Sequence, residues 1–129
     1  MRLFCAALIA SPLPVFAQAL NCSSAQTQVE MTGCAARAYE AADGDLNDAY
    51  KLARSAVRSW DAAQPGLEPS NEVMLRDAQR AWLPFRDKAC AAESTMARGG
   101  SMQNMIYYIC LERLTRQRTE DLRIMGEVN

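Results

Sequence analysis

The sequence predicts an all-α protein: a small antiparallel bundle of about three main helices with a short N-terminal helical extension, stapled by two disulfides. Three observations support this fold class. Apolar residues recur at helical spacing in three long segments, and no segment has the signals of a β-strand. Cys90 and Cys110 also lie symmetrically about Gly99-Gly100. A pair of helices that turns at these glycines places the two cysteines level with each other.

Residues 1–19 have the features of a secretory signal peptide. Arg2 gives a short positive region, an apolar run follows from Leu3 to Ala10, and Ala17-Gln18-Ala19 matches a cleavage site. The apolar run is much shorter than the roughly 20 residues that span a bilayer. We therefore expect a signal peptide over residues 1–19, a single domain over residues 20–129, and a periplasmic or secreted protein without a membrane span.

The first long helix is predicted by an apolar stripe with spacings of three and four residues. The stripe consists of Tyr39, Ala42, Leu46, Tyr50, Ala53, Val57 and Trp60. Pro65-Gly66 ends this helix, because that pair does not continue helical backbone. The segment before it is predicted to hold a short helix that runs from a cap near Cys22 through Val29, with Thr32-Gly33 as a break.

The second helix is predicted to start at Ser70 or Asn71 as its N-cap, with Glu72 in the first turn. Its predicted buried stripe is Met74, Ala78, Ala81, Trp82, Phe85 and Ala89. Pro84 predicts a kink near Trp82, since proline removes a backbone donor and crowds the preceding turn. After a turn over residues 97–101, a third helix is predicted from about Met102 to Met125. The residues predicted to face inward are Met105, Ile106, Ile109, Leu114 and Leu122.

The four cysteines of residues 20–129 permit three disulfide pairings. Symmetry favours Cys90 with Cys110, which leaves Cys22 with Cys34 by elimination. A continuous helix would hold the latter two about 18 Å apart, whereas bridged Cα atoms lie within about 7 Å. That pairing therefore predicts a break in the helix between them. An exported compartment preserves such bridges.

The composition argues against catalysis and against several ligand classes. The chain has no histidine, which removes the commonest general base and zinc ligand, and both disulfides would leave no cysteine nucleophile in residues 20–129. A formal net charge of −1 is not the basic balance of a nucleic-acid-binding protein. Asp43 to Asn47 resembles the start of a calcium loop, but Asp48 and Arg54 occupy the positions that require glycine and glutamate. We predict no enzyme, no cofactor and no metal.

Polar residues beside the second stripe form a separate candidate cluster. Gln79 and Arg86 are seven residues apart and share a helix face beside Trp82. The favoured interpretation is a structural network that joins the first and second helices, because buried polar groups need partners. A binding role for Arg86 is the alternative.

Three motifs together resemble a known family. They are C-x-x-A-x-T-Q-x-E-M-x-x-C over Cys22 to Cys34, the segment Asp43 to Tyr50, and A-Q-x-x-W-x-x-[FY]-R-x-x-x-C over Ala78 to Cys90. This chain resembles the LprI-like lysozyme-inhibitor N-terminal domain, a family of exported four-cysteine helical proteins. The residues of the signature outside its cysteines are Asp45, Leu46, Asn47, Tyr50, Gln79, Trp82 and Arg86. The resemblance implies a periplasmic or cell-surface location and inhibition of lysozyme.

The leading hypothesis is therefore a non-enzymatic protein whose partner is a protein, expected to be a lysozyme-type muramidase that it binds and blocks. The alternative is a cell-envelope protein-interaction or assembly module with no effect on lysozyme. Two predicted loops supply the candidate partner contacts, which are Glu68 in the first loop and Arg98, Gly99 and Gly100 in the second. An acidic helix face at Glu40, Asp43 and Asp48 is a further candidate.

Overall fold

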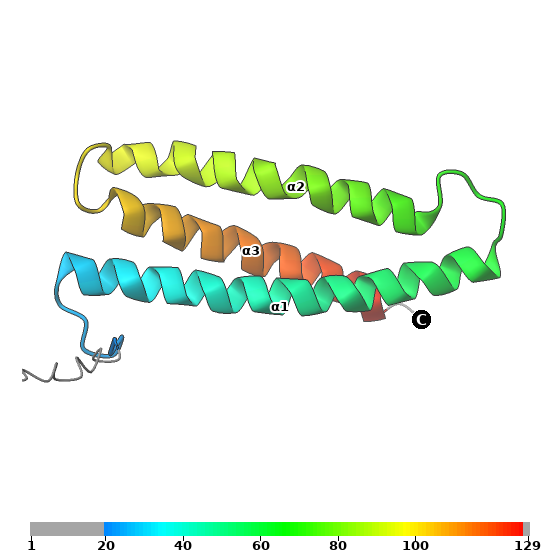
Figure 1. Ribbon diagram of the computed structural model, residues 1–129, viewed down its shortest axis with the longest axis horizontal. Coiled ribbons are helices and arrows are strands. Elements are labelled where there is room, and N and C mark those ends of the chain that lie inside the picture. Colours follow the sequence, from blue (N-terminus) through cyan, green and yellow to red (C-terminus); the bar gives the residue numbers. More distant parts are fainter. Residues whose placement is uncertain (1–19, 128–129) are drawn as a thin grey trace, which may run out of the picture.

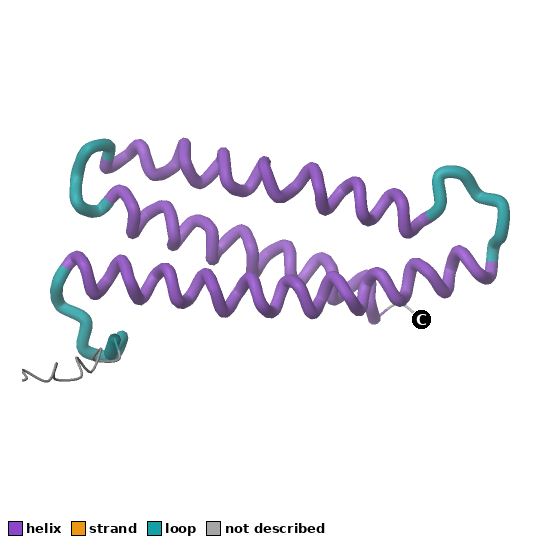
Figure 2. The backbone as a smooth tube through the Cα atoms, in the orientation of Figure 1, coloured by secondary structure: helices purple, strands orange, loops and turns teal. Residues whose placement is uncertain are grey.

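Three long helices lie side by side along one axis (Figure 1). The structure is a computed structural model that describes residues 20–127, so the predicted signal peptide lies outside the described residues. The helices are α1 (Gln28–Ala63), α2 (Asn71–Ser94) and α3 (Gln103–Glu127), with a short 3₁₀ turn, η1 (Thr95–Ala97), after α2. No strand occurs between residues 20 and 127. The predicted all-α antiparallel bundle is confirmed, and helices account for most of its backbone (Figure 2).

Capping residues determine where α1 and α2 begin. Thr27 caps α1 in a reciprocal arrangement, in which its side chain accepts from the Glu30 N–H and the Glu30 carboxylate accepts from the Thr27 N–H. Ser70 caps α2 by accepting from the Val73 N–H at 3.3 Å, which confirms one of the two predicted N-caps. At the other end, α1 stops before Gln64 and the chain turns at Gly66, whose φ of 93° favours glycine.

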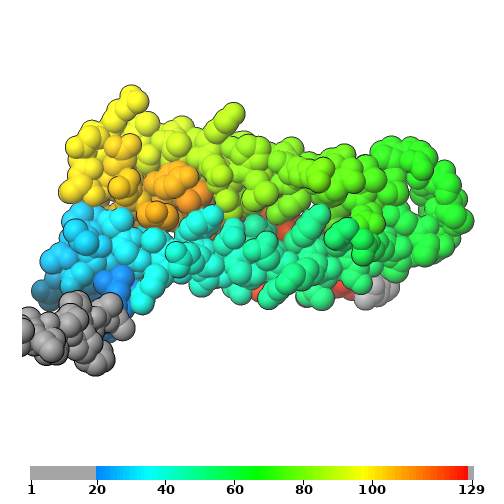
Figure 3. Space-filling view, in the orientation of Figure 1, coloured from blue at the N-terminus to red at the C-terminus, as the bar shows by residue number. Residues whose placement is uncertain are grey.

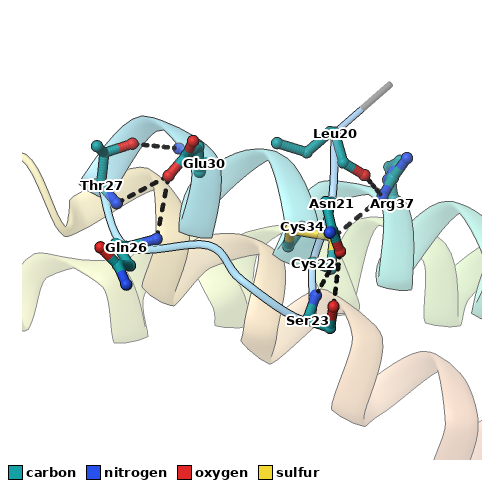
Figure 4. Close-up of a disulfide and its surroundings, with 9 residues drawn as sticks. All are labelled: Leu20, Asn21, Cys22, Ser23, Gln26, Thr27, Glu30, Cys34 and Arg37. Carbon is teal, nitrogen blue, oxygen red and sulfur yellow. Dashed lines mark hydrogen bonds between the residues drawn. A yellow bond between two sulfur atoms is a disulfide. The ribbon is translucent and has the colours of Figure 1, made fainter. Parts of the chain in front are cut away.

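The N-terminal segment differs from its prediction. No helix precedes Gln28 within the described residues, and α1 runs without a break through Thr32 and Gly33. The Cys22–Cys34 disulfide is nevertheless present, with Cα atoms 5.6 Å apart. The non-helical residues 20–27 meet the distance requirement because they fold back along α1 (Figure 4).

Two contacts hold this folded-back segment in place. The Arg37 guanidinium donates to the Leu20 carbonyl oxygen and to the sulfur of Cys22 (Figure 4). A Cβ atom on Gly33 would lie 2.8 Å from the nearest Leu20 methyl group. Gly33 therefore serves a close approach of the segment to the helix rather than a break in it.

The core lies mainly between α1 and α3. One cluster of buried residues combines Leu46, Ala49, Ala53, Val57, Leu75 and Leu122. Small residues let the two backbones approach closely: a Cβ on Gly126 of α3 would meet the backbone nitrogen of Ala53 at 3.3 Å. A second cluster surrounds the Cys90–Cys110 disulfide, whose Cα atoms are 5.4 Å apart, and includes Leu111. Both predicted disulfides are thus confirmed.

The predicted buried face of α2 is wrong. Met74 is 58% exposed and Phe85 is 61% exposed, and Ala78 and Ala81 are exposed as well. The residues of α2 that are buried instead are Leu75, Gln79, Arg86, Cys90 and Ser94. These residues share one face at spacings of four and seven, and the disulfide at Cys90 turns that face toward α3. Trp82 lies on the same side and packs against the first cluster.

The predicted kink at Pro84 and the predicted inward face of α3 can be compared with the structure. Helix α2 continues through Pro84, and Figure 2 shows no sharp kink along the length of α2. Pro84 is exposed, so the carbonyl that loses its backbone donor can bind water. In α3, Leu122 is fully buried as predicted, but Ile109 is 47% exposed. None of the helices within residues 20–127 is long and apolar enough to cross a membrane.

Candidate functional site

A groove of about 530 Å³ lies between the middle parts of α1 and α2. Figure 3 shows this face, where the cyan-to-green surface of α1 and the yellow-green surface of α2 leave a hollow in which atoms of α3 are visible. Its walls are Tyr39, Asp43, Leu46, Asn47, Tyr50 and Arg54 of α1 and Arg76, Gln79, Arg80, Leu83 and Arg86 of α2. The groove therefore combines a largely cationic α2 wall with an aromatic and polar α1 wall.

Arg86 is the centre of this site and connects all three helices. Its side chain is only 6% exposed. The guanidinium Nε donates to Asp87 Oδ1 at 2.9 Å, and Nη1 donates to Asp43 Oδ1 of α1 at 3.0 Å and to Thr115 Oγ1 of α3 at 3.3 Å. Buried charges are tolerated when they are paired and hydrogen-bonded in this way. The predicted network between the first two helices is present, and it extends to the third.

Two aromatic rings hold the guanidinium plane. The central carbon of Arg86 lies 5.3 Å from the ring centroid of Tyr39 and 5.3 Å from that of Trp82, both within cation–π range. Burial alone would lower the pKa of Arg86, but its hydrogen bonds and charge contacts with Asp87 and Asp43 outweigh this effect and raise it. Burial raises the pKa of Tyr39, against the opposing charge of Arg86. Both groups therefore keep one protonation state at neutral pH.

Gln79 occupies the same buried face one level along α2. Its Oε1 accepts a hydrogen bond from Arg118 Nε of α3 at 3.1 Å, and the residue is 8% exposed. Thr119, the next residue of α3 after Arg118, is buried and its hydroxyl donates to the Thr115 carbonyl at 2.8 Å. The polar layer thus continues from Arg86 to Gln79 along the line where α2 meets α3.

A second charged cluster fixes the start of α2 to the end of α1. Asp61 accepts from the backbone N–H groups of Glu72, at 3.0 Å, and Asn71, at 2.8 Å, and these bonds lower its pKa. The Glu72 carboxylate pairs with Arg58 at 2.7 Å and with Arg54 at 2.6 Å. Hydrogen bonds from Arg58 and then Arg54 lower the pKa of Glu72 to about 2.

This cluster predicts a loss of stability in acid. A carboxyl group whose pKa is lower in the folded protein stabilises the fold above its unfolded pKa, and that stabilisation disappears as the pH falls through the folded value. We expect the free energy of unfolding to decrease between the ordinary glutamate value of 4.5 and about 2. Urea unfolding followed by circular dichroism across this range measures the decrease.

The variant Glu72→Gln should show a smaller acid-dependent decrease than the natural chain. Glu40→Gln is the matched control, because Glu40 is exposed and makes no ion pair within residues 20–127. Equal slopes for the natural chain and Glu72→Gln would contradict the assignment of the acid response to this cluster.

The predicted partner-contact residues do not form one surface. Glu68 lies in the loop between α1 and α2, and Arg98, Gly99 and Gly100 lie in the turn between α2 and α3, at the opposite end of the bundle (Figure 1). Helix α2 separates them, and its 24 residues correspond to about 36 Å. Of the predicted acidic face, Asp43 pairs with Arg86 and Asp48 pairs with Lys51 at 2.9 Å, whereas Glu40 is exposed.

A sequence model of the family described as Lysozyme inhibitor LprI matches residues 20–122. The chain belongs to this family. It is also 36% identical over 110 residues to an uncharacterized protein of Rhizobium meliloti (strain 1021), a match that covers 83% of this chain and 79% of the relative. The crystal structure of a DUF1311 family protein from Pseudomonas putida KT2440 is similar, with a TM-score of 0.67 at 24% identity over 80% of this chain and 97% of that one. The latter comparison supports the three-helix fold.

The residues that the motif resemblance singled out converge on the groove. Those that line it are Leu46, Asn47, Tyr50, Gln79 and Arg86. Trp82 supplies one of the two aromatic rings within cation–π distance of Arg86. Asp45 is the exception, because it is exposed and lies 3.8 Å from Arg116 of α3. The residues singled out by the motif resemblance thus occupy mainly one site rather than the loops.

The calcium-like segment of the sequence is helical, and Arg86 has a buried partner in α3. Asp43 to Asn47 is continuous helix within α1, and residues 20–127 hold no group of three acidic, cysteine or histidine side chains arranged for a metal. The sequence reasoning missed Thr115, the α3 partner of Arg86. The signal was the spacing of Leu111, Thr115, Thr119 and Leu122, which forms a stripe once threonine is counted as a core residue.

Proposed function

We propose that this protein is a non-enzymatic periplasmic binding protein that binds and blocks a lysozyme-type muramidase. The observation that carries the proposal is the family match, which spans residues 20–122. Two disulfides support an extracytoplasmic location, since oxidising compartments preserve them. We also propose that residues 1–19 direct export and that residues 20–129 form the mature single domain.

The loop between α1 and α2 is the contact surface that charge favours. Lysozyme-type enzymes carry catalytic carboxylates in a cleft and are often cationic outside it. Residues 64–69 are all exposed and include Glu68, whereas the opposite turn carries Arg98. An acidic loop therefore matches a cationic rim, where charge mainly accelerates association. We assign the muramidase contact to the end of the bundle that carries Glu68.

A cell-wall lysis assay tests both parts of the proposal. The oxidised protein, residues 20–129, is titrated into a fixed amount of lysozyme, and we expect stoichiometric inhibition. Glu68→Lys should weaken inhibition roughly two- to fivefold, the range for a single exposed charge at an interface. Arg98→Glu, a reversal of similar size in the opposite turn, is the matched control and should not weaken it.

The possible outcomes separate the activity from the contact surface. A loss of inhibition with Arg98→Glu but not with Glu68→Lys would move the contact to the other end of the bundle. No inhibition of lysozymes of several types would contradict the proposed function. The protein would then be tested as a cell-envelope interaction or assembly module through the envelope components that purify with it.

A further inference from the structure

Two largely buried residues that line the groove carry hydrogen-bond donors that no group of residues 20–127 accepts. The three hydrogen bonds of Arg86 engage Nε and Nη1, and no group in residues 20–127 accepts one from Nη2. Gln79 uses its Oε1 oxygen for Arg118, and its amide nitrogen has no acceptor in the same part of the chain. Both residues are more than nine-tenths buried, and both line the groove.

Both unused groups are hydrogen-bond donors, so each requires an acceptor. An arginine nitrogen carries N–H donors and no acceptor, and the amide nitrogen of glutamine is likewise only a donor. No side-chain nitrogen or oxygen of the described residues is both fully buried and without a partner. The two free nitrogens therefore remain accessible, and the groove is the opening that both side chains line. A complementary ligand presents oxygen atoms to them.

The remaining charges of the groove favour a single negative charge on that ligand. Arg54 and Arg76 are paired with Glu72 and Asp77, and Arg86 is paired with Asp43 and Asp87. Arg80 lines the groove, is exposed and makes no ion pair within residues 20–127. One unpaired cation in a groove that also contains Asp43 suits a monoanionic carboxylate better than a phosphate dianion. The arginine fork also matches carboxylate geometry.

The size and the other walls of the groove fit a short peptide. Its volume of about 530 Å³ lies within the range of small-molecule sites. The rings of Tyr39 and Tyr50 and the side chains of Leu46 and Leu83 supply apolar surface, and the exposed amide of Asn47 can pair with a peptide group. We propose that the groove between α1 and α2 binds the carboxylate of a short peptide segment through Gln79, Arg80 and Arg86.

This site is separate from the Glu68 loop, and it does not require the proposed inhibition of a muramidase. Nuclear magnetic resonance titrations of the oxidised protein, residues 20–129, test it without any lysozyme present. N-acetyl-trialanine with a free terminal carboxylate and N-acetyl-Ala-Glu-Ala amide are the two carboxylate probes. N-acetyl-trialanine amide is the uncharged control. We expect saturable shifts of backbone amides in the groove segments of α1 and α2 with at least one carboxylate probe.

The two carboxylate probes distinguish the source of the ligand. A response to the free terminus indicates capture of a chain end, and a response to the glutamate peptide indicates capture of an acidic side chain. Equal affinity for the uncharged amide would overturn the carboxylate assignment. Shifts confined to other surfaces, or no shifts at millimolar peptide, would overturn the site.

Variants test the donors without removing the buried guanidinium. Gln79→Glu keeps an acceptor for Arg118 but removes both amide donors, and Arg80→Ala removes the unpaired cation. Each should weaken carboxylate binding about tenfold, the usual scale for a hydrogen bond to a charged group. Arg123→Ala on α3, outside the groove, is the control and should bind as the natural chain does. Unchanged affinity in both groove variants, with unchanged circular dichroism, would contradict the proposal.

Discussion

Replacing Cys90 and Cys110 together with alanine lowers the free energy of unfolding by about 3–4 kcal/mol, which is the largest single effect that we expect in this molecule. The bridge closes a segment of 20 residues, so its removal releases conformational entropy to the unfolded chain. Both cysteines are also fully buried and pack with Leu111, so the double variant loses core contacts as well.

Urea unfolding followed by circular dichroism measures this loss. The matched comparison is Cys22→Ala with Cys34→Ala, which opens a shorter segment of 12 residues. That bridge fastens the folded-back residues 20–27 to α1 and lies outside the contacts between the helices, so its removal should cost less. An equal or larger loss in the N-terminal pair would show that the folded-back segment contributes more to the bundle than its exposure indicates.

Arg86→Met should be the most destabilising substitution in the groove, at about 2–4 kcal/mol. The methionine side chain fills part of the space but leaves the Thr115 hydroxyl, which is fully buried, without its Arg86 contact. It also removes two charged hydrogen bonds and both cation–π contacts. Asp43 and Asp87 are partly exposed and can be hydrated, which keeps the loss below that of a fully buried ion pair.

Two further variants separate the contributions of charge and geometry to the contacts of Arg86. Arg86→Lys keeps the charge but loses the planar fork, so we expect an intermediate loss. Asp87→Asn removes the charge of the more exposed partner and should cost less than about 1 kcal/mol. Chemical denaturation of the three variants under one set of conditions gives the ranking. If Arg86→Met were as stable as the natural chain, Arg86 would not organise the fold.

Most of the fold could be predicted from the sequence because local signals agree with one another. The stripe from Leu46 to Val57 predicts the buried face of α1, whereas Pro65-Gly66 and the Ser70 cap predict the end of α1 and the start of α2. The orientation of α2 could not be predicted from apolar residues alone. Its inward face carries Gln79 and Arg86, whereas Met74 and Phe85 face outward, so a hydrophobic criterion selects the wrong side.

The information needed to orient α2 was nevertheless present in the cysteines. Cys90 must face α3 to form its bridge with Cys110, and Arg86 and Gln79 lie four and eleven residues before it. Those spacings place all three residues on one helix face. A disulfide therefore specified the buried side of this helix more reliably than hydropathy did, because a covalent bond fixes direction and hydropathy gives only a tendency.

The role of Gly33 could not be predicted from the local sequence around it. Glycine in a helical segment is read as a possible break, since it costs about 1 kcal/mol relative to alanine. Here its missing side chain makes room for Leu20, which comes thirteen residues earlier and is not part of any helix. No local sequence pattern predicts such a contact, because the position of residues 20–27 depends on the Cys22–Cys34 bridge.

The separation of the two loops by the length of α2 has a practical consequence for binding measurements. A label or surface linkage placed at Ser101 lies at the end of the bundle that carries Arg98, and it leaves the Glu68 end and the middle of the rod unobstructed. A linkage near Leu67 covers the Glu68 end and leaves the Arg98 end unobstructed. Two immobilised forms of one chain therefore present different ends to the same solution of partners, and comparing them assigns each partner to an end without any change to the residues that bind it.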